Sequence, residues 1–115
     1  CPTNALDEYK IDSNKCISYR SIEHRGPFKT NESELEGWIY GCDICQEVCP
    51  WNQKFSQTSA EKAFYARKEI IEWEDDDWAS LNEDGFRKLF KKSAVKRTKY
   101  SGLSRNIKQN LEKET

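Results

Sequence analysis

Three cysteines lie close together in the stretch from Tyr40 to Trp51, which reads YGCDICQEVCPW. The spacing of Cys42, Cys45 and Cys49 is C-x2-C-x3-C, and a proline follows directly. An iron–sulfur cluster needs several thiolates within a few ångströms of one another, and this spacing supplies them. The stretch therefore predicts a cluster site rather than a set of packed thiols.

The other two cysteines extend this stretch into a ferredoxin-type pattern. Such a run is C-x2-C-x2-C-x3-C-P, and its fourth cysteine ligates the other cluster of a pair. Cys1, followed by Pro2, matches the end of one run, and Cys16 opens a second run with a 25-residue insertion before Cys42. Crossed ligation then predicts one cluster held by Cys1, Cys16, Cys42 and Cys45, whereas Cys49 serves the other cluster.

Two other uses of these thiols stay open. Four of them could bind zinc, because C-x2-C is also a zinc spacing, although C-x2-C-x3-C-P is not a usual zinc knuckle and one thiol would be left over. Disulfides or inert buried thiols are disfavoured, because Cys42 and Cys45 are too close in sequence for an ordinary bridge and the count of five is odd. His24, the single histidine, is expected on the surface or beside the ligands rather than among them.

The composition indicates a small chain with a lean core. Of its 115 residues 36% are hydrophobic and 34% are charged, so a bound metal is expected to help stabilise it. No apolar run approaches the length of a membrane span. Closely spaced thiols fit metal binding in a reducing compartment, so we expect a cytoplasmic protein. The chain has no methionine and opens on a cysteine, which favours a piece of a longer protein.

Short elements are expected to position the cysteines. Residues 9–12 alternate polar and apolar side chains as a brief strand does. A helix is expected over residues 16–22, with Asp12 or Ser13 as its cap. A polar loop over residues 30–37 then leads back to the cysteine stretch.

The second half of the chain reads as a polar linker followed by helices. The linker is expected over residues 52–60, and residues 61–73 are expected to be partly helical. Ser80 followed three residues later by Glu83 is a capping-box pattern, and Ser101 is expected to cap the last helix. Two apolar faces are predicted, one on each of the last two helices: Phe86, Leu89 and Phe90, and Leu103, Ile107 and Leu111.

Charge is segregated in this half. Eight acidic residues lie between Glu69 and Asp84, and nine basic residues with no acidic one lie from Arg87 to Lys108. Two solvated helix faces would explain the pattern. A basic strip that meets a phosphate backbone is the functional alternative.

With these motifs assembled, the chain resembles the epoxyqueuosine reductases, the iron–sulfur and cobalamin enzymes of queuosine tRNA modification. The resemblance rests on three segments and returns more loosely in two others. The segments are CPTNA at 1–5, CISYRSIEHRGP at 16–27 and IYGCDICQEVCPWN at 39–52, then SAVKR at 93–97 and GLSRN at 102–106. The middle segment is the most specific, because cluster ligation does not require it.

The resemblance implies a cobalamin-binding domain before a two-cluster ferredoxin-like domain and a helical-repeat region after it. The clusters would pass electrons to cobalamin, which drives removal of the epoxide oxygen from the tRNA base. The residues implied are Ser18 and Asp43 near the corrin, Arg25 near the tRNA or cofactor, and Lys96, Arg97, Lys99 and Arg105 at tRNA phosphates. The general acid would precede residue 1, so no catalytic residue is expected in this chain.

The prediction is an α+β chain in three parts. These are a partial ferredoxin-like domain with [4Fe-4S] clusters (1–55), a connecting segment (56–79) and the start of a HEAT-like helical region (80–115). We expect a monomer that receives electrons from a separate donor and does not associate with a membrane. The alternatives are a ferredoxin-like electron carrier, another corrinoid enzyme such as a reductive dehalogenase, and a zinc-stabilised RNA-binding module without redox activity.

Overall fold

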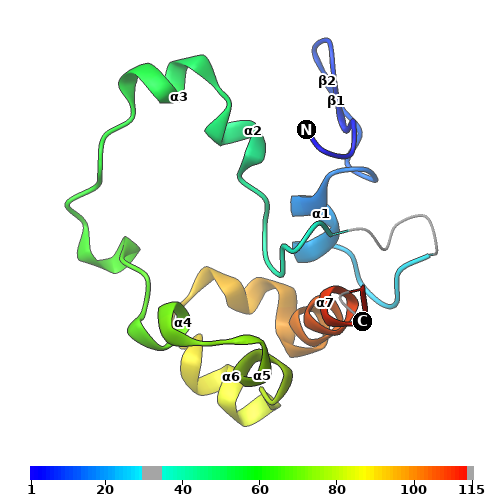
Figure 1. Cartoon of the computed structure of the whole chain (residues 1–115), viewed down its shortest axis with the longest axis vertical. Helices are drawn as coiled ribbons and strands as arrows, with labels where there is room; N and C mark the ends of the chain where they lie inside the picture. Colours follow the sequence, from blue (N-terminus) through cyan, green and yellow to red (C-terminus); the bar gives the residue numbers. More distant parts are fainter. Residues whose placement is uncertain (30–34, 114–115) are drawn as a thin grey trace.

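Short helices dominate the chain in the computed structural model, which describes residues 1–29 and 35–113 (Figure 1). Strands β1 (Leu6–Asp7) and β2 (Lys10–Ile11) form a two-stranded antiparallel hairpin near the N-terminus. The helical elements follow in the order α1 (Ile17–Ile22), α2 (Ile44–Glu47), α3 (Pro50–Phe55), η2 (Lys62–Phe64), α4 (Lys68–Glu72), α5 (Asp75–Ala79), α6 (Glu83–Leu89), η3 (Ala94–Thr98) and α7 (Lys99–Lys113).

The elements next to the first cysteines agree with the prediction in place but not in capping. The expected strand is β2, and the expected helix is α1. The N-cap of α1 is Cys16 itself, so the expected cap at Asp12 or Ser13 is wrong. Asp12 instead accepts a hydrogen bond from the backbone N–H of Asn14, which shapes the turn before the helix. Residues 30–34 of the expected polar loop lie outside the described residues.

The apolar core lies between α6 and α7, as the two predicted faces indicate. Phe86, Phe90, Leu103 and Ile107 are buried there, and Leu89 and Leu111 pack against them. Tyr100 lies against the Phe86 ring and donates its hydroxyl hydrogen to the Leu81 carbonyl. Helix α7 also contacts α1, α5 and η3, so the last helix packs against the segment that follows Cys16.

Three expectations for the second half are wrong. The expected linker begins with α3, because Pro50 at its first position suits a helix start. The cap of α6 is Asn82, whose side chain accepts the Gly85 N–H at 2.7 Å, while Ser80 ends α5. Ser101 does not cap α7, because that helix starts at Lys99. The helical-repeat region stays a prediction.

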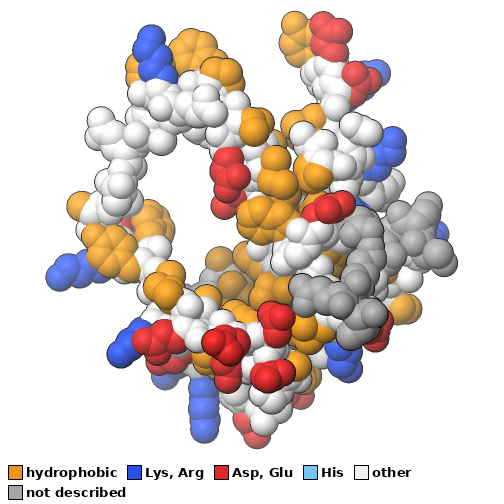
Figure 2. Space-filling view, in the orientation of Figure 1, with side chains coloured by type: hydrophobic (Ala, Val, Ile, Leu, Met, Phe, Trp, Pro, Cys, Tyr) orange, Lys and Arg blue, Asp and Glu red, His pale blue; other side chains and the backbone are white. Residues whose placement is uncertain are grey.

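Helices α2 and α3 and the segment that follows them arch away from the rest of the chain (Figure 1). The space-filling view shows open space between this arch and the body of the protein (Figure 2). Trp51 and Phe55 stack on each other in α3, and 72% and 58% of their surfaces are exposed. Among the described residues, no helix has both the length and the apolar character that crossing a membrane requires.

Candidate metal centre

None of the five cysteines forms a disulfide, so each carries a thiol that could ligate iron. Cys16 and Cys49 are the N-cap residues of α1 and α3, and neither side chain makes a capping hydrogen bond. The Cys1 sulfur accepts the Ala5 N–H at 3.4 Å, which is the kind of contact that stabilises a ligating thiolate. Cysteine thiolates are the usual ligands of iron–sulfur clusters, so the type of donor atom at these positions fits such a cluster.

The structure does not gather these thiols into a closed ligand set. Over residues 1–29 and 35–113, no three His, Cys, Asp or Glu side chains are grouped closely enough to hold a metal ion. The predicted assignment, with Cys1, Cys16, Cys42 and Cys45 around one cluster and Cys49 at the other, stays a prediction. His24 has a separate contact, because its Nε2 lies 3.1 Å from the Pro27 carbonyl oxygen.

The insertion between Cys16 and Cys42 is bound to η3 and α7 by buried polar side chains. Asn106 donates from its amide nitrogen to the carbonyl oxygens of Ser21 at 2.8 Å and Ile39 at 2.9 Å. The Thr98 hydroxyl donates to the same Ser21 oxygen at 2.8 Å. Asn106 has no exposed surface and Thr98 is almost fully buried, so these bonds form without competing water.

Arg105 is the second fastening of the insertion. Its guanidinium donates to the carbonyl oxygens of Arg20, His24 and Gly26 at 2.9–3.1 Å. Its Nε and Nη2 also donate to Asn106 Oδ1, so all five N–H donors are used. Burial first, and the nearby Arg25 charge second, lower the pKa of Arg105 below its usual value. The structure therefore supports a structural role for Arg105 and leaves no donor for a tRNA phosphate.

The other two predicted arginines also make internal contacts. Arg25 donates to the carbonyl oxygens of Ile22 at 3.1 Å and Arg97 at 3.1 Å. Arg97 pairs with Glu23, at 2.5 Å from Nε and 3.1 Å from Nη2. The hydrogen bond between these two side chains lowers the pKa of Glu23 and raises the pKa of Arg97. The pair is exposed, so solvent screens it.

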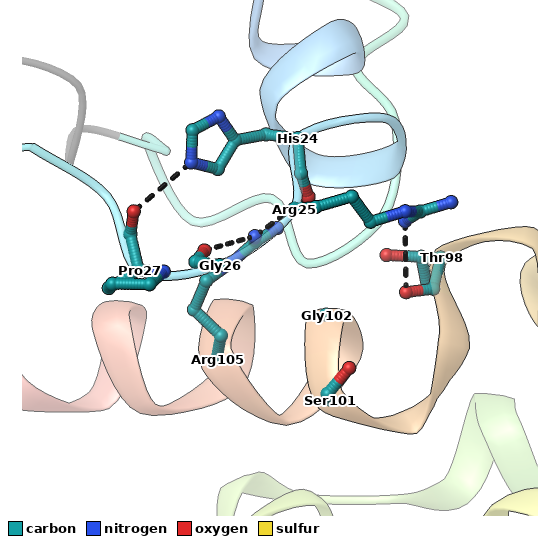
Figure 3. Close-up of a pocket in the computed structure, with 8 residues that line it drawn as sticks. All are labelled: His24, Arg25, Gly26, Pro27, Thr98, Ser101, Gly102 and Arg105. Carbon is teal, nitrogen blue, oxygen red and sulfur yellow. Dashed lines mark hydrogen bonds between the residues drawn. The ribbon is translucent and has the colours of Figure 1, made fainter.

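A pocket of about 310 Å³ lies between the insertion and the start of α7 (Figure 3). Figure 3 shows Arg105 rising from α7 toward Gly26, and Arg25 reaching over Thr98. Lys96 and Lys99 lie outside this pocket lining, and both are exposed. Of the predicted basic contacts, these two lysines are therefore the ones most open to a partner.

Ser18 and Asp43, which the resemblance places near a corrin, occupy different surroundings. Ser18 is half-buried in α1, and its carbonyl oxygen accepts the Ser21 hydroxyl at 3.2 Å. Asp43 is exposed at the N-cap of α2 and lines a polar pocket between α2 and α3. Ser18 is not part of that pocket lining, and the position of both residues near a corrin stays a prediction.

Sequence reasoning missed the polar side chains of α7 that hold the insertion. Asn106 and Asn110 are four residues apart, beside the apolar stripe that the prediction used. Asn110 donates to the Trp38 carbonyl oxygen at 2.9 Å and accepts the Gly37 N–H at 3.1 Å. A pair of amide side chains at helical spacing next to an apolar face is the signal that could have found them.

Comparison with known protein families first defines the class. Residues 1–52 match the 4Fe-4S double cluster binding domain, and this match covers all five cysteines. Residues 1–52 thus have the sequence pattern of a two-cluster 4Fe-4S domain. No solved structure matches it.

Comparison with curated proteins then confirms the resemblance to one family. The chain is 44% identical over 93% of its length to an epoxyqueuosine reductase of Cellulophaga algicola, and 40% identical over 97% to one of Synechocystis. An epoxyqueuosine reductase of Escherichia coli is 39% identical over 93% of the chain. The chain is therefore a relative of the epoxyqueuosine reductases, which are oxidoreductases. It spans 35%, 40% and 28% of the lengths of these three relatives.

Proposed function

We propose that this chain is the iron–sulfur part of an epoxyqueuosine reductase and relays electrons to cobalamin for reduction of epoxyqueuosine to queuosine in tRNA. The observation that carries the proposal is the cysteine stretch, which lies inside the matched 4Fe-4S segment of a chain related to these enzymes along nearly its whole length. The same relationship disfavours a stand-alone carrier or a dehalogenase.

The thiols supply what the electron relay needs. Five free cysteines within residues 1–49 are donors for [4Fe-4S] clusters, and each cluster transfers one electron at a time. Removal of an epoxide oxygen to leave an alkene consumes two electrons and two protons and releases water, so two one-electron centres suit the reaction. Cobalamin would supply the carrier of those electrons to the substrate. Ser18 and Asp43 are the residues of this chain proposed to lie near it.

The proposal is tested on the complete encoded protein that contains these residues. We expect anaerobically loaded protein with cobalamin and a chemical reductant to convert epoxyqueuosine in tRNA to queuosine, as measured by mass spectrometry of the digested tRNA. Protein treated identically without iron and sulfide is the control and should give no product. If the protein binds both clusters and cobalamin but forms no queuosine, the proposed substrate is wrong. If the protein takes up no iron, the proposed cofactor is wrong.

Binding of tRNA gives a separate prediction about the basic strip. Replacing Lys96 and Lys99 by alanine should weaken tRNA binding and reduce the slope of log K against log salt by about 1.5, since each lost phosphate contact removes roughly 0.7–0.9. Both lysines are exposed on or beside η3. Filter binding or anisotropy between low and moderate salt measures the slope.

The matched control removes two other exposed lysines, Lys10 in β2 and Lys62 in η2. This variant has the same net charge as the double mutant in the strip, so a general charge effect would change both equally. We expect the control to keep the wild-type slope. Equal slopes in all three proteins would mean that the strip is a solvated helix face.

A further inference from the structure

The backbone that leads into Cys42 is held by a chain of three hydrogen bonds that run through two fully buried residues, Ser21 and Asn106. The Gly41 N–H donates to the Ser21 hydroxyl oxygen at 2.9 Å, which ties the residue before Cys42 to α1. The amide of Asn106 bonds the carbonyl oxygens of Ser21 and Ile39, as described above. Ser21 and Asn106 have no exposed surface. One side chain of α7 thus joins the helix that begins after Cys16 to the segment that ends at Cys42.

We propose that Asn106 is a positioning residue for the iron–sulfur site and that α7 is a part of the cluster-binding unit. The inference rests on the proposed function, because it assumes that Cys16 and Cys42 ligate a cluster. Asn106 does not touch a ligand; it fixes the two backbone segments that carry these cysteines relative to each other. A ligand set held in place needs less reorganisation when the cluster forms and binds it more firmly.

The two ends of this link differ in how they depend on Asn106. The Ser21 carbonyl oxygen has a second donor, the Thr98 hydroxyl, so α1 stays attached to η3 without Asn106. The Ile39 carbonyl oxygen accepts from Asn106, and Ile39 lies only three residues before Cys42. Loss of the amide therefore removes this bond on the Cys42 side, and it also removes the acceptor of Arg105 Nε and Nη2. It leaves a partly buried carbonyl without this donor.

Two further side chains, Asn110 of α7 and Tyr40, also hold the segment that precedes Cys42. Asn110, one turn later, bonds the backbone of Gly37 and Trp38, and Tyr40 donates its hydroxyl hydrogen to the Ala94 carbonyl oxygen at 3.0 Å. Five hydrogen bonds to α1, η3 and α7, four at backbone atoms and one from the Tyr40 side chain, thus hold the segment from residue 37 to residue 41. Helix α7, which starts fifty residues after Cys49, therefore helps to fix the backbone that precedes Cys42.

The test compares Asn106→Ala with Leu103→Ala in the complete encoded protein. Leu103 is the matched control, because it is fully buried in the same helix but packs in the apolar core with Phe86 and Phe90. After anaerobic loading with iron and sulfide, release of iron to a chelator is followed well below the melting temperatures of both variants. We expect Asn106→Ala to release iron at least tenfold faster than wild type, and Leu103→Ala within about twofold of it.

A milder variant guards against loss of folding. Ser21→Ala removes the acceptor of the Gly41 N–H and leaves the Ser21 carbonyl and its two donors in place. We expect severalfold faster iron release and a changed electron paramagnetic resonance spectrum of the reduced cluster, with a melting temperature close to that of wild type.

The outcomes separate this proposal from the function. Iron release at the wild-type rate in Asn106→Ala and Ser21→Ala would overturn the positioning role and leave the proposed function intact. Equal acceleration in Asn106→Ala and Leu103→Ala, at equal loss of thermal stability, would overturn it as well, because general destabilisation would then explain the release. A wild-type protein that takes up no cluster would overturn both proposals.

Discussion

Replacing Arg105 by alanine should lower the free energy of unfolding by about 3–5 kcal/mol, because several acceptors lose a charged donor at once. The guanidinium bonds three backbone carbonyl oxygens and the Asn106 side chain. It also lies 4.1 Å above the centre of the Phe28 ring, a contact that adds roughly 0.5–1 kcal/mol. Urea unfolding followed by tryptophan fluorescence measures the change.

Two variants show whether geometry or charge is responsible. Arg105→Lys keeps the charge but offers three donors without the planar fork, so it should recover less than half of the lost stability. Arg87→Ala is the control, because Arg87 pairs with Glu83 at 3.0 Å on the exposed face of α6 and should cost less than about 0.5 kcal/mol. A loss below about 1 kcal/mol for Arg105→Ala would contradict the structural role.

The helical part of the fold was predictable where apolar residues repeat at helical spacing. The stripe of Leu103, Ile107 and Leu111 predicts α7, and Phe86 and Phe90 predict the face of α6 that packs against it. An apolar face at helical spacing indicates a buried side of a helix even when the segment that covers it is unknown. The helix ends were less predictable. Asn82 and Ser80 are both good caps two residues apart, and the sequence alone does not say which one the chain uses.

The side chains that hold the candidate site were not predictable from local patterns. Arg105 has the same sequence signature as a phosphate-binding arginine, a basic residue in a basic strip. Its partners are carbonyl oxygens about eighty residues earlier, and only the packing of α7 on α1 brings them together. Asn106 likewise donates to the backbone carbonyl oxygens of Ser21 and Ile39. Every residue has such an oxygen, so the side chains of these two residues do not indicate the contact. The cysteine spacing, by contrast, carries its chemistry within twelve residues.

Serine substitutions of the cysteines should divide them into two groups. In the 115-residue chain, we expect Cys16→Ser, Cys42→Ser and Cys45→Ser each to lose nearly all reconstituted iron, because a [4Fe-4S] cluster with four thiolate ligands tolerates the loss of one poorly. We expect Cys49→Ser to keep its iron, since crossed ligation assigns Cys49 to the other cluster. Iron and acid-labile sulfide per chain, with the visible absorbance of the cluster, measure the difference.

The control is the amount of iron in the wild-type chain under the same conditions. Crossed ligation predicts at most about four irons per chain, because Cys49 alone cannot hold a second cluster. About eight irons in a stable form would contradict that assignment, and so would loss of iron from Cys49→Ser equal to that from Cys42→Ser. Tetrahedral zinc in place of iron needs four of the five thiols and no labile sulfide, so retention of zinc without sulfide would favour the zinc alternative. Because none of the four substituted cysteines forms a disulfide, and neither Cys16 nor Cys49 makes a capping hydrogen bond with its side chain, each substitution removes a potential ligand without breaking a disulfide or a cap.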